Sequence, residues 1–412
     1  MFAAFSTALS GLSANAIAVE AISNNLANLN TAGYKATGVE FHDLMSQALG
    51  DGIGSTEVGQ GVGPVNTVRN FSQGAVQTTG GAFDAAIQGD GFFVVRDQTN
   101  QTLYTRAGNF VLDANGNLMT ATGENVQGWS ATNGVVNAGG AIGNLNIPVG
   151  AVIPATATTK MSMDVNLDSQ AATGTAVTAP IEVIDSQGGS HVLTASFTKT
   201  AANTWSYTVT IPAADLTSGG SNSVATGSLT FDSSGQLTSP AAGADPSVKI
   251  TGMANGAADM TIDWNLYNAA GTGRLTQFAQ TSGLSTSTQD GTAAGQITNV
   301  GLTDNGLVVA KYSNGQQATV GQLAVAAVRN PETLLAVGNN NLQATVDTAP
   351  PAIGTSDSGG RGKVLGGCIE ASTVDIAHEF TQLITMQRSY QANSKVITTS
   401  DQLLQDTLNM KQ

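Results

Sequence analysis

The sequence predicts a multi-domain protein with an α-helix at each end and two mainly antiparallel β domains between them. Three observations predict this. Both ends repeat apolar residues at helical spacing, the middle is rich in hairpin-turn sequences, and 412 residues exceed what one hydrophobic core usually serves. We expect the terminal helices to form a coiled-coil-like inner domain, and the outer β domain to be inserted in the inner one.

Near the N-terminus, apolar residues recur at alternating steps of three and four, which places them on one side of a helix. This alternation is close to the roughly 3.5-residue period of a coiled-coil seam. Asn28, Asn30, Thr31 and Gly33 are poor helix formers, so we expect the helix to end near them. The apolar stripe consists of Phe2, Phe5, Leu9, Leu12, Ala16 and Val19, followed after a one-residue slip by Ile22, Leu26 and Leu29.

The C-terminal segment has the same spacing. A hydroxyl cap at Ser372 or Thr373 and an early carboxylate at Asp375 predict a helix from about Thr373 to near the C-terminus. Its stripe is Ile376, Phe380, Leu383, Gln387, Tyr390, Ser394, Ile397, Asp401, Leu404 and Leu408.

Neither terminal helix can bury its stripe alone, and the spacing allows two arrangements. Each helix could pack on a nearby globular core, or the two could pair with each other and with copies in neighbouring subunits. The position at the extreme chain ends, where unanchored segments usually fray, favours the second arrangement.

Between the helices the pattern becomes β. The stretch from Val39 to Gly63 is rich in glycine and has no sustained period, so we expect a linker or extended arm, with strands from about Phe71. Residues 92–95 are a short apolar run typical of a buried strand. Turn sequences between apolar runs predict antiparallel hairpins at residues 113–117, 184–189, 231–235 and 312–315.

Composition marks residues 151–290 as an inserted β domain, because this stretch is rich in Thr, Ser, Ala and Gly and contains strand-like runs at residues 205–209 and 262–264. The predicted domains are therefore a terminal helical domain (1–35 and 365–412), a linker or arm (36–70), an inner β domain (71–150 and 291–364) and an outer β domain (151–290).

Charge and cysteine content argue against several classes of function. The chain carries 15 Lys and Arg against 29 Asp and Glu, a formal net charge of −14. This balance argues against a nucleic-acid binder, which needs a basic face, and against a polybasic membrane-surface protein. Cys368 is the single cysteine, which leaves no disulfide framework and no cysteine-based zinc cluster.

The first 34 residues also bear on location. They carry one charge, Glu20, and their apolar residues are interrupted by Ser and Asn. We therefore expect neither a cleaved secretory signal nor a membrane span.

Candidate chemistry is sparse. Asp113, Asn115, Asn117 and Glu124 have the spacing of calcium-loop ligands, but Leu118 stands where such a loop needs glycine, so a hairpin is the stronger interpretation. The histidines, His42, His191 and His378, have no paired spacing. We predict no catalytic, cofactor or metal site, and no enzyme.

Both ends resemble the bacterial flagellar rod and hook proteins, a family of axial structural subunits. The N-terminal part of the resemblance lies in residues 10–15 and 24–35, and the C-terminal part in residues 374–380 and 387–397. Residues 87–94 and 104–110 in the β region are also typical of this family. Together these motifs cover the helices and the inner β domain, about two thirds of the chain.

Within that family, the rod members are shorter because they lack an outer domain. The insert at residues 151–290 resembles the outer domain of hook subunits. The resemblance therefore implies a hook subunit that self-assembles into a curved helical tube and acts as a flexible universal joint passing torque from rod to filament. It also implies an extracellular location in the flagellum after export without a cleaved signal peptide.

The resemblance implies that the terminal helices form the inner tube and that residues 34–69 join it to the outer domains. The implied partners are other copies of the chain, the rod, the hook–filament junction protein, the hook cap and the flagellar export apparatus, with no nucleic acid and no membrane insertion. The expected assembly residues are Leu9, Leu12, Leu26, Phe380, Leu383, Tyr390, Ile397 and Leu404, and the expected linker residues are Tyr34, Gly52, Gly61 and Arg69.

Two alternatives stay open on the sequence alone. A distal-rod protein of the same family would form a straight, rigid assembly. A secreted β-rich enzyme or adhesin would instead place a deep pocket with clustered carboxylates, or a binding face, in the β region.

Overall fold

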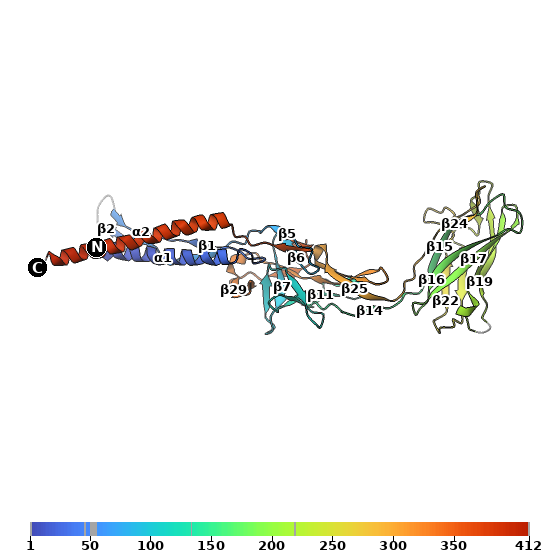
Figure 1. The fold of residues 1–412 in the computed structure, drawn as a ribbon, viewed down its shortest axis with the longest axis horizontal. Helices are drawn as coiled ribbons and strands as arrows, with labels where there is room; N and C mark the ends of the chain where they lie inside the picture. The colour runs from blue at the N-terminus through green and yellow to red at the C-terminus, as the bar shows by residue number, and fades with distance from the viewer. Residues whose placement is uncertain (1, 45–46, 50–55, 133, 218–219, 411–412) are drawn as a thin grey trace. The chain divides into compact units, whose positions relative to one another are not determined.

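The computed structural model describes residues 2–44, 47–49, 56–132, 134–217 and 220–410 (Figure 1). The chain divides into two compact units. Unit 1 comprises Met1–Val149, Asn299–Ala310 and Gln317–Gln412, and unit 2 comprises Gly150–Thr298 and Lys311–Gln316. The prediction of a β-rich chain with a helix at each end is confirmed.

Helix α1 (Phe2–Ala27) and helix α2 (Ile376–Asn409) lie side by side and antiparallel in unit 1 (Figure 1). A Cβ added at Gly11 would lie 3.0 Å from the Asn393 side chain, and Asn25 donates to Glu379 at 3.0 Å. The helices therefore pair with each other, which is one part of the second arrangement; pairing with neighbouring copies stays a prediction.

The cap of α2 differs from the prediction. The Asp375 carboxylate accepts hydrogen bonds from the N–H groups of Ala377 (2.8 Å) and His378 (3.1 Å), so Asp375 caps the helix. The Thr373 hydroxyl instead accepts the N–H of Ala36 at 2.8 Å. This bond joins the segment just before α2 to the start of the arm.

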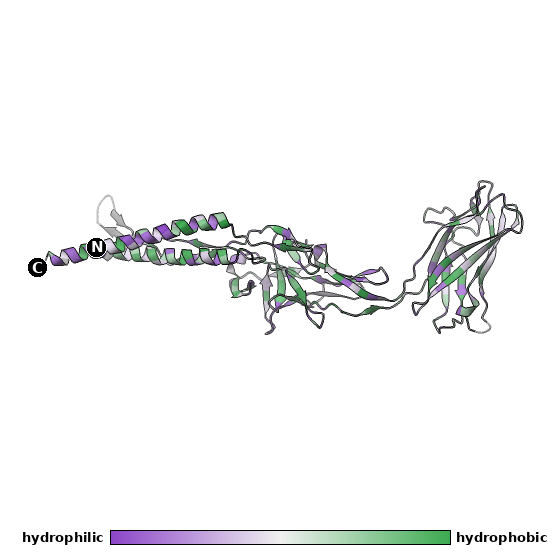
Figure 2. Cartoon of the chain, viewed as in Figure 1, coloured by the Kyte–Doolittle hydropathy of each residue, from purple (hydrophilic) through white to green (hydrophobic). Residues whose placement is uncertain are grey.

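Between Ala4 and Ala27, α1 is long and apolar enough to cross a membrane by length and composition (Figure 2). By those two criteria the segment is more apolar than expected, because Ala, Ile, Leu and Val outweigh the interrupting Ser and Asn. Core helices of soluble proteins meet the same criteria, and α1 packs along α2.

The arm between α1 and the β region is folded back on itself. Strand β1 (Thr37–Glu40) pairs antiparallel with β4 (Asn66–Arg69), and β2 (Gln47–Leu49) pairs with β3 (Thr56–Val58). The N–H of Val62 donates to the Ser10 hydroxyl at 3.2 Å, which ties the returning strand to α1. The prediction that strands begin near Phe71 is therefore wrong, because strands of three or four residues are too short to show a clear period.

The main sheet of unit 1 is apolar on both faces. Phe93 and Val95 enter one buried cluster, and Phe92 and Val94 enter a second on the opposite face, which confirms the buried run at residues 92–95. The order is β27 (Gln317–Leu323), β11 (Asn125–Thr132), β7 (Phe92–Arg96), β8 (Thr102–Thr105), β30 (Asn341–Gln343) and β29 (Leu335–Gly338).

Shorter strands complete unit 1. Those joined to the main sheet are β9 (Phe110–Leu112), β10 (Leu118–Thr120), β12 (Val135–Val136), β13 (Gly143–Asn144), β28 (Val325–Ala327) and β31 (Ala352–Gly354). Separate pairs are β6 (Ala85–Gln88) with β32 (Lys363–Gly366) and β5 (Val76–Thr78) with β33 (Cys368–Glu370). Two 3₁₀ turns, η2 (Asp304–Gly306) and η3 (Pro331–Thr333), also lie here.

Unit 2 contains two five-stranded sheets around one core that includes Phe197, Trp205 and Trp264. The first sheet is β16 (Ala176–Ile184), β17 (Ser190–Ala201), β18 (Thr204–Thr210), β19 (Ser223–Phe231) and β20 (Leu237–Ser239). The second is β21 (Ser247–Ile250), β22 (Met260–Trp264), β15 (Lys160–Asn166), β23 (Leu275–Thr276) and β24 (Gly283–Gln289). The strands predicted at residues 205–209 and 262–264 are confirmed.

Strand β15 runs parallel to β22 and β23, so the second sheet departs from the expected antiparallel pattern. Unit 2 also holds η1 (Ala213–Asp215) and β14 (Val152–Ile153), which pairs with the start of β25 (Gly295–Leu302). Strands β25 and β26 (Leu307–Tyr312) are divided between the residue ranges of the two units.

The predicted hairpin turns are confirmed, and three of them, at residues 113–117, 184–189 and 231–235, share one device. The side chain of Asp113 accepts the N–H groups of Asn115 and Asn117, and Asp232 accepts those of Ser234 and Gln236. An aspartate that bonds the backbone of its own turn stabilises the reversal without tertiary contacts. The segment with calcium-loop spacing is therefore a hairpin.

Candidate subunit interface

Helix α1 presents two different faces. The face that packs in the chain carries mostly small or polar residues, because Ala18 and Asn25 are each 2% exposed, and its large apolar member is Ile22 at 4%. The first part of the predicted apolar stripe lies on another side, where Phe5 and Leu9 remain 38% and 50% exposed. These large apolar side chains near the start of α1 are thus left exposed by the described chain.

Helix α2 also has a partly covered side and an exposed side. Leu383, Ile397 and Leu404 are half-buried, whereas Phe380 and Tyr390 are 51% and 40% exposed. At a net gain of about 1.5–3 kcal/mol for each fully buried Leu, Ile or Phe, covering these faces would provide a substantial driving force for association.

The structure thus separates the eight predicted assembly residues into two groups. Leu9, Phe380 and Tyr390 are exposed, and Leu12, Leu26, Leu383, Ile397 and Leu404 are half-buried. Their role in assembly stays a prediction.

Sequence reasoning omitted further exposed apolar residues beside the stripes, which are Ile17, Ile384, Val396 and Leu403. Their apolar character was the available signal, but their positions lie off a strict 3–4 repeat.

Among the predicted linker residues, Gly61 packs against α1, because a Cβ there would lie 2.3 Å from the Ser10 hydroxyl oxygen. Tyr34 and Arg69 lie where the arm meets the β region, and Arg69 closes the β1–β4 pair opposite Thr37. Gly52 lies outside the described residues.

A buried amide joins both helices to the arm. Asn25 donates to the Thr37 carbonyl and to Glu379, and its side-chain oxygen accepts the Thr37 N–H (2.9 Å) and the Tyr34 hydroxyl (3.2 Å). Burial raises the pKa of Glu379 above its usual range, and the bond from Asn25 opposes this only in part. Asn25 therefore fixes the position of α1, α2 and the arm relative to one another.

A buried ion cluster lies beside this amide. Glu370 pairs with Lys35 at 2.6 Å and with Arg106 at 3.2 Å, and Glu370 is 0% exposed. Burial lowers the pKa of Lys35, which the carboxylate of Glu370 opposes. Gly33 allows the close approach, because its φ is +68° and a Cβ would lie 2.5 Å from the Arg106 carbonyl carbon. The cluster holds three distant parts of unit 1 together.

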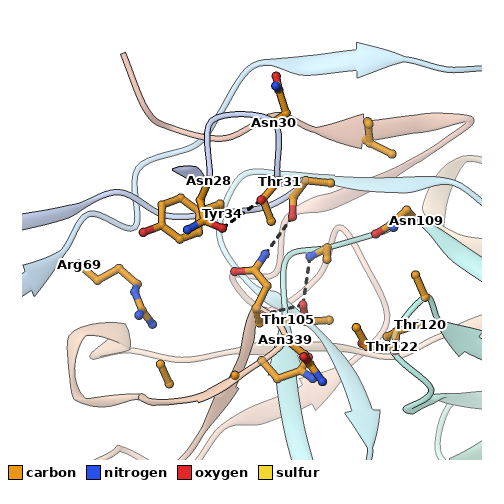
Figure 3. A pocket seen from close by; sticks show the side chains of 18 residues that line it. Asn28, Asn30, Thr31, Tyr34, Arg69, Thr105, Asn109, Thr120, Thr122 and Asn339 are labelled. Atoms are coloured by element: carbon orange, nitrogen blue, oxygen red, sulfur yellow. Dashed lines mark hydrogen bonds between the residues drawn. The ribbon is translucent and has the colours of Figure 1, made fainter. Parts of the chain in front are cut away.

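Next to these networks, unit 1 has an open groove of about 700 Å³ (Figure 3). Asn28, Thr31 and Tyr34 come from the segment after α1, and Thr122 and Asn339 come from the β region. Most of the residues that line the groove carry an amide or hydroxyl side chain, and Arg69 is the charged one. Within the described part of the chain, no group of three or more His, Cys, Asp or Glu side chains is placed to hold a metal ion.

Paired terminal helices with exposed apolar residues, attached to a β body, are typical of a structural subunit. Comparison with known families agrees over four stretches of the chain. Residues 5–35 match the flagella basal body rod protein family, and residues 86–170 match the flagellar hook protein FlgE/F/G D1 domain. Residues 144–292 match the flagellar basal body protein FlaE D2 domain, and residues 365–410 match the flagellar basal body rod FlgEFG protein C-terminal family.

Full-length relatives identify the family more closely. The chain is 34% identical to the flagellar hook protein FlgE of Rhizobium meliloti, over 100% of this chain and 99% of the relative. It is 31% identical to FlgE of Escherichia coli, over 99% and 100% respectively. It is 33% identical to FlgE of Borreliella burgdorferi, over 98% of each chain. The chain belongs to the flagellar hook protein family.

The fold has a solved counterpart. The crystal structure of the Helicobacter pylori flagellar hook protein FlgE2 aligns with a TM-score of 0.50 at 15% identity, covering 70% of this chain and 99% of that one. At this identity the likeness concerns the fold.

Proposed function

We propose that this chain is the structural subunit of a bacterial flagellar hook and that its terminal helices form the inner layer of the tube. The observation that carries the proposal is the exposed apolar face on each helix of a chain that matches hook proteins over its whole length. The match of residues 144–292 to a D2 domain favours a hook over a rod subunit, because the shorter rod members lack an outer domain.

In this proposal, α1 and α2 continue as a coiled-coil-like layer in which neighbouring copies cover Leu9 and Phe380. Heterologous contacts that do not close into a ring generate a helical tube. The amide and ion networks around Asn25 and Glu370 would hold the helix pair firmly to the inner β domain, so that torque passes between them. The division into units 1 and 2 supports a separate outer domain near residues 151–290, inserted in the inner one.

Family membership also supports the remaining proposals. The subunit would lie in the flagellum outside the cell, after export without a cleaved signal peptide. It would contact the rod at one end of the hook and the hook–filament junction protein at the other, with the hook cap and the export apparatus as partners during assembly. The family is a structural one, not an enzyme family.

Assembly of the purified full chain tests the proposal. We expect the wild type to form tubes visible by electron microscopy. Leu9→Asp and Phe380→Asp should each raise the critical concentration at least about tenfold, because a buried apolar contact becomes a buried charge. The matched control is Phe278→Asp, in which a phenylalanine of unit 2 that is 44% exposed is changed. Tubes formed by both helix variants at wild-type concentrations would overturn the proposal.

A further inference from the structure

The outer strand of the unit 1 sheet is an uncovered edge. Strand β29 pairs with β30 on one side, and no other described strand lies on its free side. All four residues of β29 are exposed, with Leu335 at 57% and Val337 at 45%. Sheet edges are usually protected by charges, proline or a covering segment, but these two side chains are apolar.

The groove described above lies along this strand. Ala336 and Gly338 of β29 line it, opposite the segment that follows α1 (Figure 3). The side chains of Asn30, Asn109 and Arg69 also line it and make no hydrogen bond or ion pair with any described residue. Amide side chains offer both a donor and an acceptor, which is the complement of a peptide group.

The charge of the groove favours another copy of this chain. Arg69 is the one charged residue that lines it, whereas the chain as a whole has a net charge of −14. The Glu124 carboxylate beneath the groove is buried and already accepts hydrogen bonds from Thr120, Thr122 and Asn341. The groove also continues directly from the end of α1, the helix whose outer face we assign to assembly. An extended segment can add to a free strand edge and place alternate side chains in an adjoining groove.

We propose that β29 and this groove receive an extended, acidic segment of a neighbouring copy, as a second contact between subunits. The segment pairs its backbone with β29, covers Leu335 and Val337, and places a carboxylate near Arg69. This inference rests on the proposed function and adds a contact that the helix faces do not supply.

Crosslinking in the assembled full chain tests the contact directly. A photo-crosslinking amino acid replaces Val337 in one variant and Val192 in the other. Val192 is a matched control because it is 47% exposed and lies within strand β17 of unit 2. We expect position 337 to crosslink two copies in the polymer and not in dilute monomer, with mass spectrometry mapping the partner to an acid-bearing extended segment. Tubes without intermolecular crosslinks from position 337 would overturn the inference.

Substitution separates this inference from the proposed function. Val337→Lys should raise the critical concentration for assembly about tenfold, and Arg69→Glu should weaken assembly most at low salt. Val192→Lys should leave the critical concentration for assembly within about twofold of the wild-type value. If the wild type assembles and both groove variants match it, the groove contact is wrong while the helix interface stands. If the wild type forms no tubes, the proposed function itself fails.

Discussion

Single residues decide how firmly the helices are joined to the β region. Glu370 pairs with both Lys35 and Arg106 in a buried site, and it also accepts the N–H of Gly74 at 2.7 Å. Removing one member of such a cluster leaves uncompensated buried charge, which costs far more than the intact cluster contributes.

Glu370→Gln should therefore lower the free energy of unfolding of unit 1 by about 3–5 kcal/mol. Urea denaturation followed by circular dichroism measures this. Asp304→Asn is the control, because it breaks the exposed Lys363–Asp304 pair of 3.5 Å and should cost less than about 1 kcal/mol. Equal losses for the two variants would show that the buried cluster has no special role.

A second residue-scale feature lies in unit 2, where His191 is held between two carboxylates. Its Nε2 lies 2.9 Å from Asp185 and its Nδ1 lies 3.1 Å from Asp215. Burial alone would lower the pKa of His191, but the two carboxylates outweigh it and raise the pKa above 6.5. For Asp185, bonds from His191, Asn255 and two backbone N–H groups outweigh burial and lower the pKa to about 2.

The raised pKa predicts a pH dependence with a defined sign. A histidine whose pKa is higher in the folded state contributes stability that is complete below about pH 6.5 and is lost as the pH rises through the folded-state pKa. The calorimetric transition of unit 2 should therefore weaken above about pH 6.5. His191→Gln should remove this dependence, and His42→Gln, in an exposed histidine of unit 1, should not. An unchanged pH profile in His191→Gln would contradict the assignment.

At the scale of elements, α1 is a helix with a small-residue face and a large-residue face. Ala18 lies seven residues from both Gly11 and Asn25, so it shares their face towards α2. The small side chains let the two helices approach closely. The large exposed side chains, such as Phe5 and Leu9, are left for other contacts.

Ala18→Leu should force α1 and α2 apart and lower the free energy of unfolding of the monomer by about 1–3 kcal/mol. Ala16→Leu is the matched control, because Ala16 is exposed and the same substitution there should change stability by less than about 0.5 kcal/mol. Thermal unfolding of dilute, unassembled protein compares them. Similar losses would mean that Ala18 is not in a tight helix contact.

The sequence allowed the prediction of elements whose signal is local. The stripe from Phe5 to Val19 gave the first helix, and the Asp-to-Gly turn at Asp113 gave a hairpin. The face of α1 towards α2 could not be predicted, because Ala8, Gly11 and Ala18 carry little apolar signal.

The long-range contacts were also beyond local patterns. Glu370 lies 335 residues from Lys35 and 264 from Arg106, so no spacing rule connects them. The strands of the arm were missed because they are only three or four residues long, too short to show a period of two. The groove along β29 depends on tertiary structure and has no sequence signature of its own.

At the scale of the whole molecule, different parts of the chain have different physical tasks. Apolar helix faces supply a driving force for association that is largely non-directional. Buried polar networks around Asn25 and Glu370 specify one geometry at the junction with the β region. Outer surfaces rich in Thr, Ser and Gly can change contacts at small energy cost, which suits a tube that bends as it rotates.

Electron cryomicroscopy of tubes assembled from the full chain would show what covers the helix faces. We expect the side chains of Leu9 and Phe380 to be buried against helices of neighbouring copies, while the α1–α2 pairing of Gly11 with Asn393 stays as it is in the single chain. A reconstruction in which these two apolar side chains face only solvent, with the subunits held together by their β domains alone, would contradict this expectation.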